Sequence, residues 1–110
     1  MPTTYKVLGQ VAPSAVTATT LYTVPSATQA VVSTINVVNT SATTTDSIRI
    51  AIRPAGAALE LNDYIVYGLN LSAGATFTYT GGVTLGATDV ITVYATNGTC
   101  SFNAFGSEIS

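Results

Sequence analysis

The sequence has no histidine and no tryptophan, and among its 110 residues there are only one cysteine and three basic side chains. The absence of histidine excludes Ser-His-Asp triads, imidazole general bases and zinc sites that use histidine. The single cysteine, Cys100, excludes a disulfide within the chain, and its place in a predicted strand is typical of a small buried apolar residue. Because Lys6, Arg49 and Arg53 are the only cations, there is no basic patch for phosphates, and we predict no nucleic-acid binding.

Charge of both signs is scarce, at 7% of residues, whereas an average soluble domain has roughly 25%. Threonine and serine supply the polarity instead, at about a quarter of the chain, unlike the charge-rich composition of disordered segments. No apolar run approaches the ~18 residues of a membrane span, so no membrane segment is expected. The first residues, MPTTYK, lack the apolar region of a secretory signal, which predicts synthesis in a cytoplasm. A surface with so little charge predicts that partners cover much of it.

Short β-forming runs separated by turn residues fill most of the chain. Before the last two strands, the expected strands are Tyr5–Val11, Thr19–Val24, Gln29–Thr40, Ile48–Arg53, Asp63–Leu71 and Ala75–Thr80. Gly68 indicates a bulge in the fifth of these. About eight strands at this spacing predict one all-β domain over residues 1–110, an antiparallel β-sandwich or a jelly-roll-like barrel. Residues 1–14 are expected to form an arm or an edge strand.

The longest run, Gln29–Thr40, is predicted to be a central strand. Its two faces carry, respectively, Val31, Ile35 and Val37, and Val32 and Val38. Because both faces are apolar, we expect both to be covered.

The last part of the chain, Thr88–Phe105, is predicted to be a hairpin. Asn97-Gly98 at its tip favours a two-residue type I′ turn, which needs positive φ at both central residues. That turn sets the expected pairs Thr96 with Thr99, Ala95 with Cys100, Tyr94 with Ser101, Val93 with Phe102, Thr92 with Asn103 and Ile91 with Ala104. The pattern places an apolar row on one face of the hairpin and polar residues with Tyr94 on the other.

The sequence contains no recognisable catalytic, cofactor-binding or metal-binding constellation. Glu60 and Asp63 are the only carboxylates close in sequence that resemble an acid–base pair, and we interpret them as loop acids before a strand. Gly81-Gly82 is not a phosphate-binding loop, since no lysine or helix follows it. We therefore predict that the protein is not an enzyme.

Three residues are candidates for a protein interface: Arg49, Arg53 and Tyr94. The two arginines lie four apart and share one face of a strand, where they could meet acidic groups of a partner. Tyr94 projects from the polar face of the predicted hairpin, and tyrosine is favoured at interfaces. The alternative for all three is an ordinary solvated sheet surface.

Three blocks carry a resemblance to a known class of proteins: LYTVPSATQAVVSTINVVNT (Leu21–Thr40), IRIAIRPAGAAL with DYIVYGLNLSAGATF (Ile48–Phe77), and LGATDVITVYATNGTCSFNAFGSEI (Leu85–Ile109). Together they resemble small all-β virion structural proteins of tailed bacteriophages. Some proteins of that kind decorate or cement capsids as trimers, and others belong to tails, baseplates or fibres. The resembling motifs are strand-and-turn patterns, and they imply no site residues.

The first functional hypothesis is a non-enzymatic capsid decoration protein located in the virion. The resemblance implies a homotrimer that contacts the major capsid protein or other virion proteins. The low charge suits such a permanent assembly, because obligate interfaces are depleted in charge. The second is a tail, baseplate or fibre component that binds a host surface glycan. A glycan site would use exposed aromatics beside polar groups, such as Tyr64 or Tyr67 near Asn62 and Asp63. A glycosidase is a third hypothesis, opposed by the small size of the chain.

Overall fold

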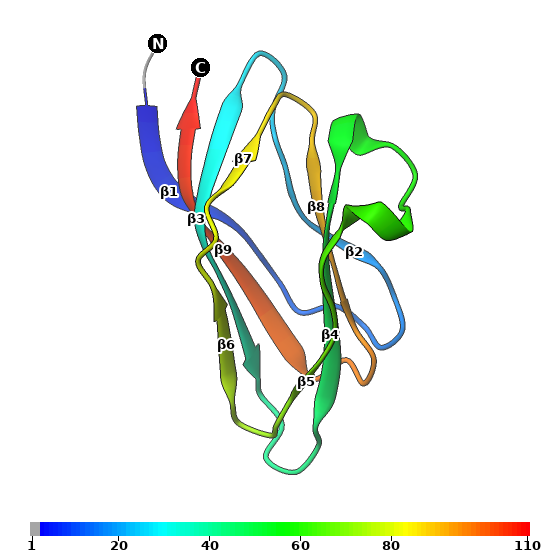
Figure 1. The fold of residues 1–110 in the computed structure, drawn as a ribbon. Coiled ribbons are helices and arrows are strands. Elements are labelled where there is room, and N and C mark those ends of the chain that lie inside the picture. The colour runs from blue at the N-terminus through cyan, green and yellow to red at the C-terminus, as the bar shows by residue number, and fades with distance from the viewer. Residues whose placement is uncertain (1–2) are drawn as a thin grey trace.

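The computed structural model describes residues 3–110, which form two antiparallel β-sheets packed face to face (Figure 1). The first sheet contains β1 (Thr3–Val11), β9 (Cys100–Ile109), β3 (Gln29–Asn39) and β6 (Thr76–Tyr79) in that order, with β7 (Val83–Leu85) also paired to β3. The second sheet contains β2 (Thr19–Thr23), β8 (Val90–Ala95), β4 (Asp46–Arg53) and β5 (Tyr64–Leu71) in that order. Two short 3₁₀ turns, η1 (Pro54–Gly56) and η2 (Leu61–Asp63), lie between β4 and β5. The predicted all-β sandwich is confirmed.

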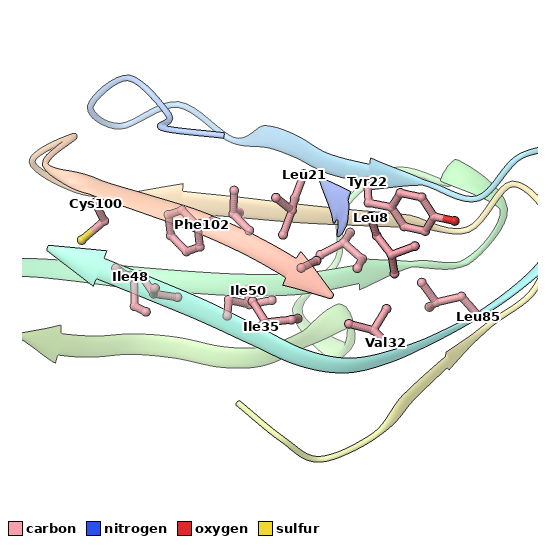
Figure 2. Close-up of a cluster of buried hydrophobic side chains, with 14 of the residues drawn as sticks. Leu8, Leu21, Tyr22, Val32, Ile35, Ile48, Ile50, Leu85, Cys100 and Phe102 are labelled. Atoms are coloured by element: carbon pink, nitrogen blue, oxygen red, sulfur yellow. The ribbon is translucent and has the colours of Figure 1, made fainter. Parts of the chain in front are cut away.

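The core lies between the two sheets and is built from alternating positions of the strands. In β4, Ile48 and Ile50 are fully buried while Arg49 between them points outward. Figure 2 shows Phe102 and Cys100 of β9 in the same interior as Ile48 and Ile50 of β4 and Leu21 of β2. Cys100 is buried, as predicted.

The predicted terminal hairpin is wrong, because β8 and β9 belong to different sheets. β8 pairs with β2 and β4, and β9 pairs with β1 and β3, so Asn97-Gly98 connects the two sheets. Only Gly98 has positive φ (68°), whereas a type I′ turn needs two such residues. None of the six predicted pairs forms: Thr96 with Thr99, Ala95 with Cys100, Tyr94 with Ser101, Val93 with Phe102, Thr92 with Asn103, and Ile91 with Ala104.

The buried rows of the two strands were nevertheless predicted correctly. Val93 of β8 and Phe102 of β9 are both fully buried in one core cluster. They reach it from opposite sheets, so a pattern that suits a hairpin also suits two facing strands.

β3 is central, as predicted, with β9 on one side and β6 and β7 on the other. The predicted grouping of its side chains is wrong, because the register with β9 shifts between Val32 and Thr34. This irregularity puts Val32 and Ile35 on the same, buried face, while Val31 is 38% exposed. Within residues 3–110, the outer face of β3 is therefore only partly covered.

β1 is the edge strand that the sequence suggested as one possibility, and it pairs antiparallel with β9. Met1 and Pro2, the start of the predicted arm, lie outside the described residues. Near its end β1 turns toward the second sheet, where a Cβ on Gly9 would lie 2.1 Å from the carbonyl oxygen of Leu21. Glycine permits this close approach, which joins the edges of the two sheets.

Candidate functional site

A row of three side chains crosses the outer face of the second sheet. Tyr67 of β5, Arg49 of β4 and Tyr94 of β8 lie opposite one another in register. The guanidinium carbon of Arg49 is 4.5 Å from the ring centroid of Tyr67 and 4.4 Å from that of Tyr94. Because β4 lies between the other two strands, the guanidinium has one ring on each side. We call these three residues the tyrosine–arginine row.

Irregularities in β5 create this arrangement. Tyr67, Leu69 and Leu71 alternate in sequence, and in a regular strand they would share one face. The register with β4 shifts at Gly68, whose φ is 72°, so Leu71 is buried and Tyr67 is 58% exposed. The predicted bulge at Gly68 is therefore confirmed, and it turns Tyr67 toward Arg49.

A second shift in β5 brings another aromatic ring to the row. The register changes again between the partners of Ile50 and Ala51, where Ile65 has no partner in β4. The ring of Tyr64 consequently packs edge-on against Tyr67, with 4.8 Å between the centroids. Aromatic contacts and cation–π contacts each stabilise such an arrangement by about 0.5–1.5 kcal/mol, which holds the rings in place.

Arg53, the other predicted interface arginine, has local partners. Its Nε donates to the Thr92 hydroxyl oxygen at 3.0 Å, and its Nη1 donates to the carbonyl oxygens of Gly56 at 3.3 Å and Ala57 at 3.1 Å. These bonds fasten the segment after β4 over the outer face of the second sheet. The structure thus brings Arg49 and Tyr94 together and gives Arg53 a separate role.

The predicted pair of carboxylates, Glu60 and Asp63, does lie close together. The two residues form a reciprocal capping box at η2, and an Asp63 carboxylate oxygen accepts from the Glu60 backbone N–H at 2.9 Å. Carboxylates at this position stabilise the start of a helical turn. Asp63, the acid of the candidate glycan site, therefore accepts a hydrogen bond within its own turn.

Asp46 is an organising residue that our interpretation of the sequence missed. It is buried at 1% exposure, and its carboxylate accepts from the backbone N–H groups of Ser47 and Asn97 at 2.8 Å and of Thr99 at 3.0 Å. The Thr99 hydroxyl donates to it as well, at 2.9 Å. Burial alone would raise the pKa of Asp46, but these hydrogen bonds outweigh burial and hold the pKa below its usual value of 3.8.

A sequence signal for Asp46 did exist. Asp46 has the same parity in the strand as Ile48 and Ile50, which places it on the core face. Its charge also affects Cys100, because burial and the neighbouring carboxylate raise the pKa of that thiol to about 12. The thiol is therefore protonated and unreactive at neutral pH.

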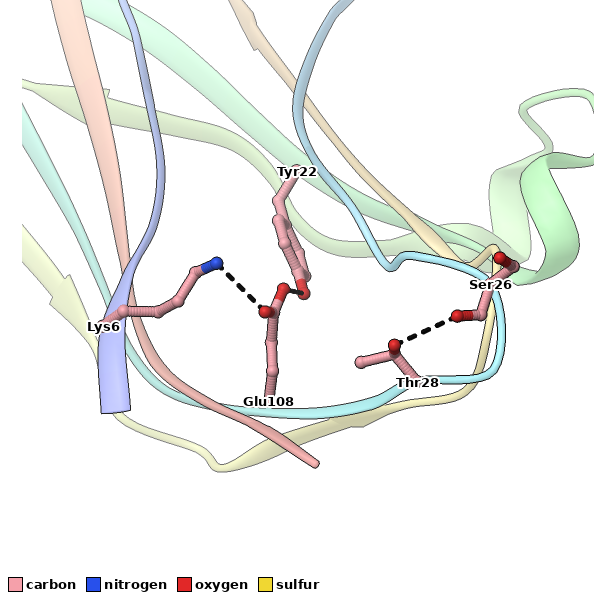
Figure 3. Close-up of polar contacts among 5 residues, drawn as sticks. All are labelled: Lys6, Tyr22, Ser26, Thr28 and Glu108. Carbon is pink, nitrogen blue, oxygen red and sulfur yellow. Dashed lines mark hydrogen bonds and ion pairs between the residues drawn. The ribbon is translucent and has the colours of Figure 1, made fainter. Parts of the chain in front are cut away.

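A second polar cluster joins the edge strand β1 to both sheets (Figure 3). Lys6 of β1 forms an ion pair with Glu108 of β9 at 3.0 Å, and the Tyr22 hydroxyl of β2 donates to the other Glu108 oxygen at 2.5 Å. The bonds from Tyr22 and Lys6 lower the pKa of Glu108, while burial and Glu108 raise that of Tyr22. Lys6 and Tyr22 are both bonded to Glu108 within the chain, so we assign the cluster a structural role.

Beside this cluster, part of the outer face of the first sheet carries exposed apolar side chains. Tyr5 is 84% exposed and Val7 is 47% exposed, and both lie on β1. A shallow groove of about 620 Å³ runs along this area, lined by Tyr5, Lys6, Val31, Ser33, Phe105, Gly106 and Ser107. Exposed apolar side chains that gather in one place are typical of surfaces that contact other proteins.

No three His, Cys, Asp or Glu side chains within residues 3–110 gather into a group that could hold a metal ion. The same residues include no helix that is long and apolar enough to span a membrane. No protein-family model matches the chain, and no curated protein matches its sequence.

Proposed function

We propose that the protein is a non-enzymatic structural component of a bacteriophage virion, a decoration protein that stabilises the capsid through protein–protein contacts. The observation that carries the proposal is the tyrosine–arginine row on the outer face of the second sheet. Tyrosine and arginine, together with tryptophan, are enriched among the residues that dominate binding energy at protein interfaces. Here they are fixed by strand pairing, which lowers the entropy lost on binding.

The proposal includes self-association, with a trimer as the expected form. Its physical support is the apolar outer face around Tyr5, Val7 and Val31, which an isolated chain leaves in water. Three-fold symmetry follows from the resemblance to capsid decoration proteins alone. Light scattering at micromolar concentration measures the oligomeric state: a stable monomer would overturn self-association, and a dimer would overturn only the trimer.

The second candidate is a tail, baseplate or fibre component that binds a host glycan. Its support is the exposed Tyr67 beside Tyr64, since sugars stack on aromatic rings. Quantitative mass spectrometry of purified virions separates the two candidates. Hundreds of copies per particle are expected of a capsid protein and tens of a tail protein, and absence from the virion would overturn both.

A further inference from the structure

We propose that Arg49 is the receptor for a single carboxylate of a different protein, which approaches the guanidinium along its exposed edge. The inference deepens the proposed function, and it depends on that function only for the identity of the partner. Its basis is the arrangement of Tyr67, Arg49 and Tyr94.

The guanidinium carbon lies over both rings, and the rings do not satisfy the hydrogen-bond donors of the guanidinium. A guanidinium carries five N–H donors in its own plane. Among residues 3–110, hydrogen bonds to protein acceptors are made by Arg53 but by no atom of the Arg49 side chain. The donors of Arg49 therefore face solvent at the centre of an aromatic surface.

No acid within residues 3–110 contacts Arg49. Four of the five acids accept hydrogen bonds from within the chain: Asp46, Asp63, Asp89 and Glu108. The fifth, Glu60, is exposed, and if a second copy placed it on Arg49, the carboxylate probe described below would produce no shift. The unmatched charge of Arg49 therefore points to a carboxylate from another protein.

A carboxylate is the group that matches the free edge. It can accept two parallel N–H bonds from one guanidinium, and such bidentate pairs are stronger than neutral hydrogen bonds. The flanking rings lower the local dielectric constant and hold the Arg49 guanidinium in position, so less entropy is lost when it pairs with a carboxylate.

A protein carboxylate is favoured over an acidic sugar. A sugar needs an open ring face for stacking, and each ring of the row has one face turned toward Arg49, which leaves only the opposite face for a sugar. An Asp or Glu side chain needs only the edge of the guanidinium. An acidic glycan is therefore an outcome that the experiment must distinguish.

NMR of the arginine Nε–Hε groups tests the proposal directly. The chain has only two arginines, so the Arg49→Lys variant assigns both signals, and Arg53 serves as an internal control because its Nε is already bonded to Thr92. The probes are N-acetyl-glutamate N-methylamide, its glutamine analogue and glucuronate.

The Arg49 signal should shift and saturate as the glutamate probe is added. The neutral glutamine analogue should need a concentration about tenfold higher to produce any response, because only the glutamate probe forms a charge-assisted pair. The Arg53 signal should stay in place. Equal shifts of both arginines, or no shift of Arg49, would overturn the site. Stronger binding of glucuronate than of the glutamate probe would overturn the protein partner.

Two variants test whether the row positions Arg49. Tyr94→Leu removes one flanking ring and should weaken the response to the glutamate probe several-fold with the fold intact. Thr76→Ala is the control, an exposed residue of β6 on the other sheet and outside both proposed surfaces, and should leave the response unchanged. Equal behaviour of the two variants would contradict a role for the rings. If the Arg49 signal does not respond to the glutamate probe but the protein is abundant in purified virions, the carboxylate site is rejected and the proposed function stands.

Discussion

The carboxylate of Asp46 in β4 receives both the backbone N–H and the hydroxyl of Thr99, at 3.0 and 2.9 Å, and so fastens the turn between the two sheets to the second sheet. The same carboxylate also receives the N–H of Asn97. These donors lie between β8 and β9, where the chain passes from one sheet to the other and makes no strand pairing. A buried donor without an acceptor lowers the stability of the fold. Asp46 therefore allows the chain to cross from one sheet to the other.

Replacement of Asp46 by Ala should destabilise the protein by about 2–5 kcal/mol, since several partly buried donors lose their acceptor and a fully buried orphaned donor costs roughly 1–3 kcal/mol. Urea unfolding followed by circular dichroism measures the change. Glu60→Ala is the matched control, an exposed acid, and should cost less than about 1 kcal/mol. Equal costs for the two variants would contradict the role assigned to Asp46.

Stability should fall in acid, and Asp46 should cause part of the fall. Its pKa is lowered in the folded state, so its contribution is complete above the unfolded pKa and is lost as the pH falls through the folded pKa. Unfolding free energies measured between about pH 6 and pH 2 should therefore decline more steeply for the wild type than for Asp46→Asn. Parallel curves would show that Asp46 titrates alike in both states.

Most strands, and the buried faces of the regular ones, were predictable because alternation in sequence reports burial directly. The Ile48 and Ile50 positions in β4 and the Phe102 position in β9 all lie where the pattern places them. Alternation does not say which strands are neighbours. Asn97-Gly98 favoured a hairpin locally, but the bonds to Asp46, far away in sequence, determine the crossing between sheets.

The candidate site was predictable in its members but not in its geometry. Arg49 and Tyr94 were identified from residue type, and Gly68 correctly indicated a bulge. The contact of Tyr67 with Arg49 depends on which residue pairs across β4 and β5 after that bulge. Register of this kind is a tertiary property, and the sequence of one strand does not contain it.

The bulge at Gly68 should be required for the tyrosine–arginine row. Gly68→Ala forces a Cβ into the left-handed region and should cost about 1–2 kcal/mol. Gly74→Ala is a close control, because both glycines have φ of 72° and open space at the Cβ position. Both variants should lose similar stability by thermal unfolding, but only Gly68→Ala should move the Arg49 Nε–Hε signal. A shift of that signal in both variants would contradict the account.

The edge strand β1 should loosen when Glu108 is replaced by Gln. The variant removes the ion pair with Lys6 and weakens the bond from Tyr22, for a total of about 1–2 kcal/mol. Hydrogen exchange should accelerate at the amides of β1 that pair with β9, by about tenfold, and should change little in β3. Uniform acceleration through both strands would mean that the cluster stabilises the whole domain and not the edge.

The central claim is that this protein binds another virion protein through Arg49, and the most direct measurement is its binding to phage particles that lack it. Wild-type protein should bind such particles to saturation, and Arg49→Lys, which keeps the charge but loses the planar fork, should bind at least about tenfold more weakly. Failure of the wild type to bind, or equal affinity of the two proteins, would contradict the claim.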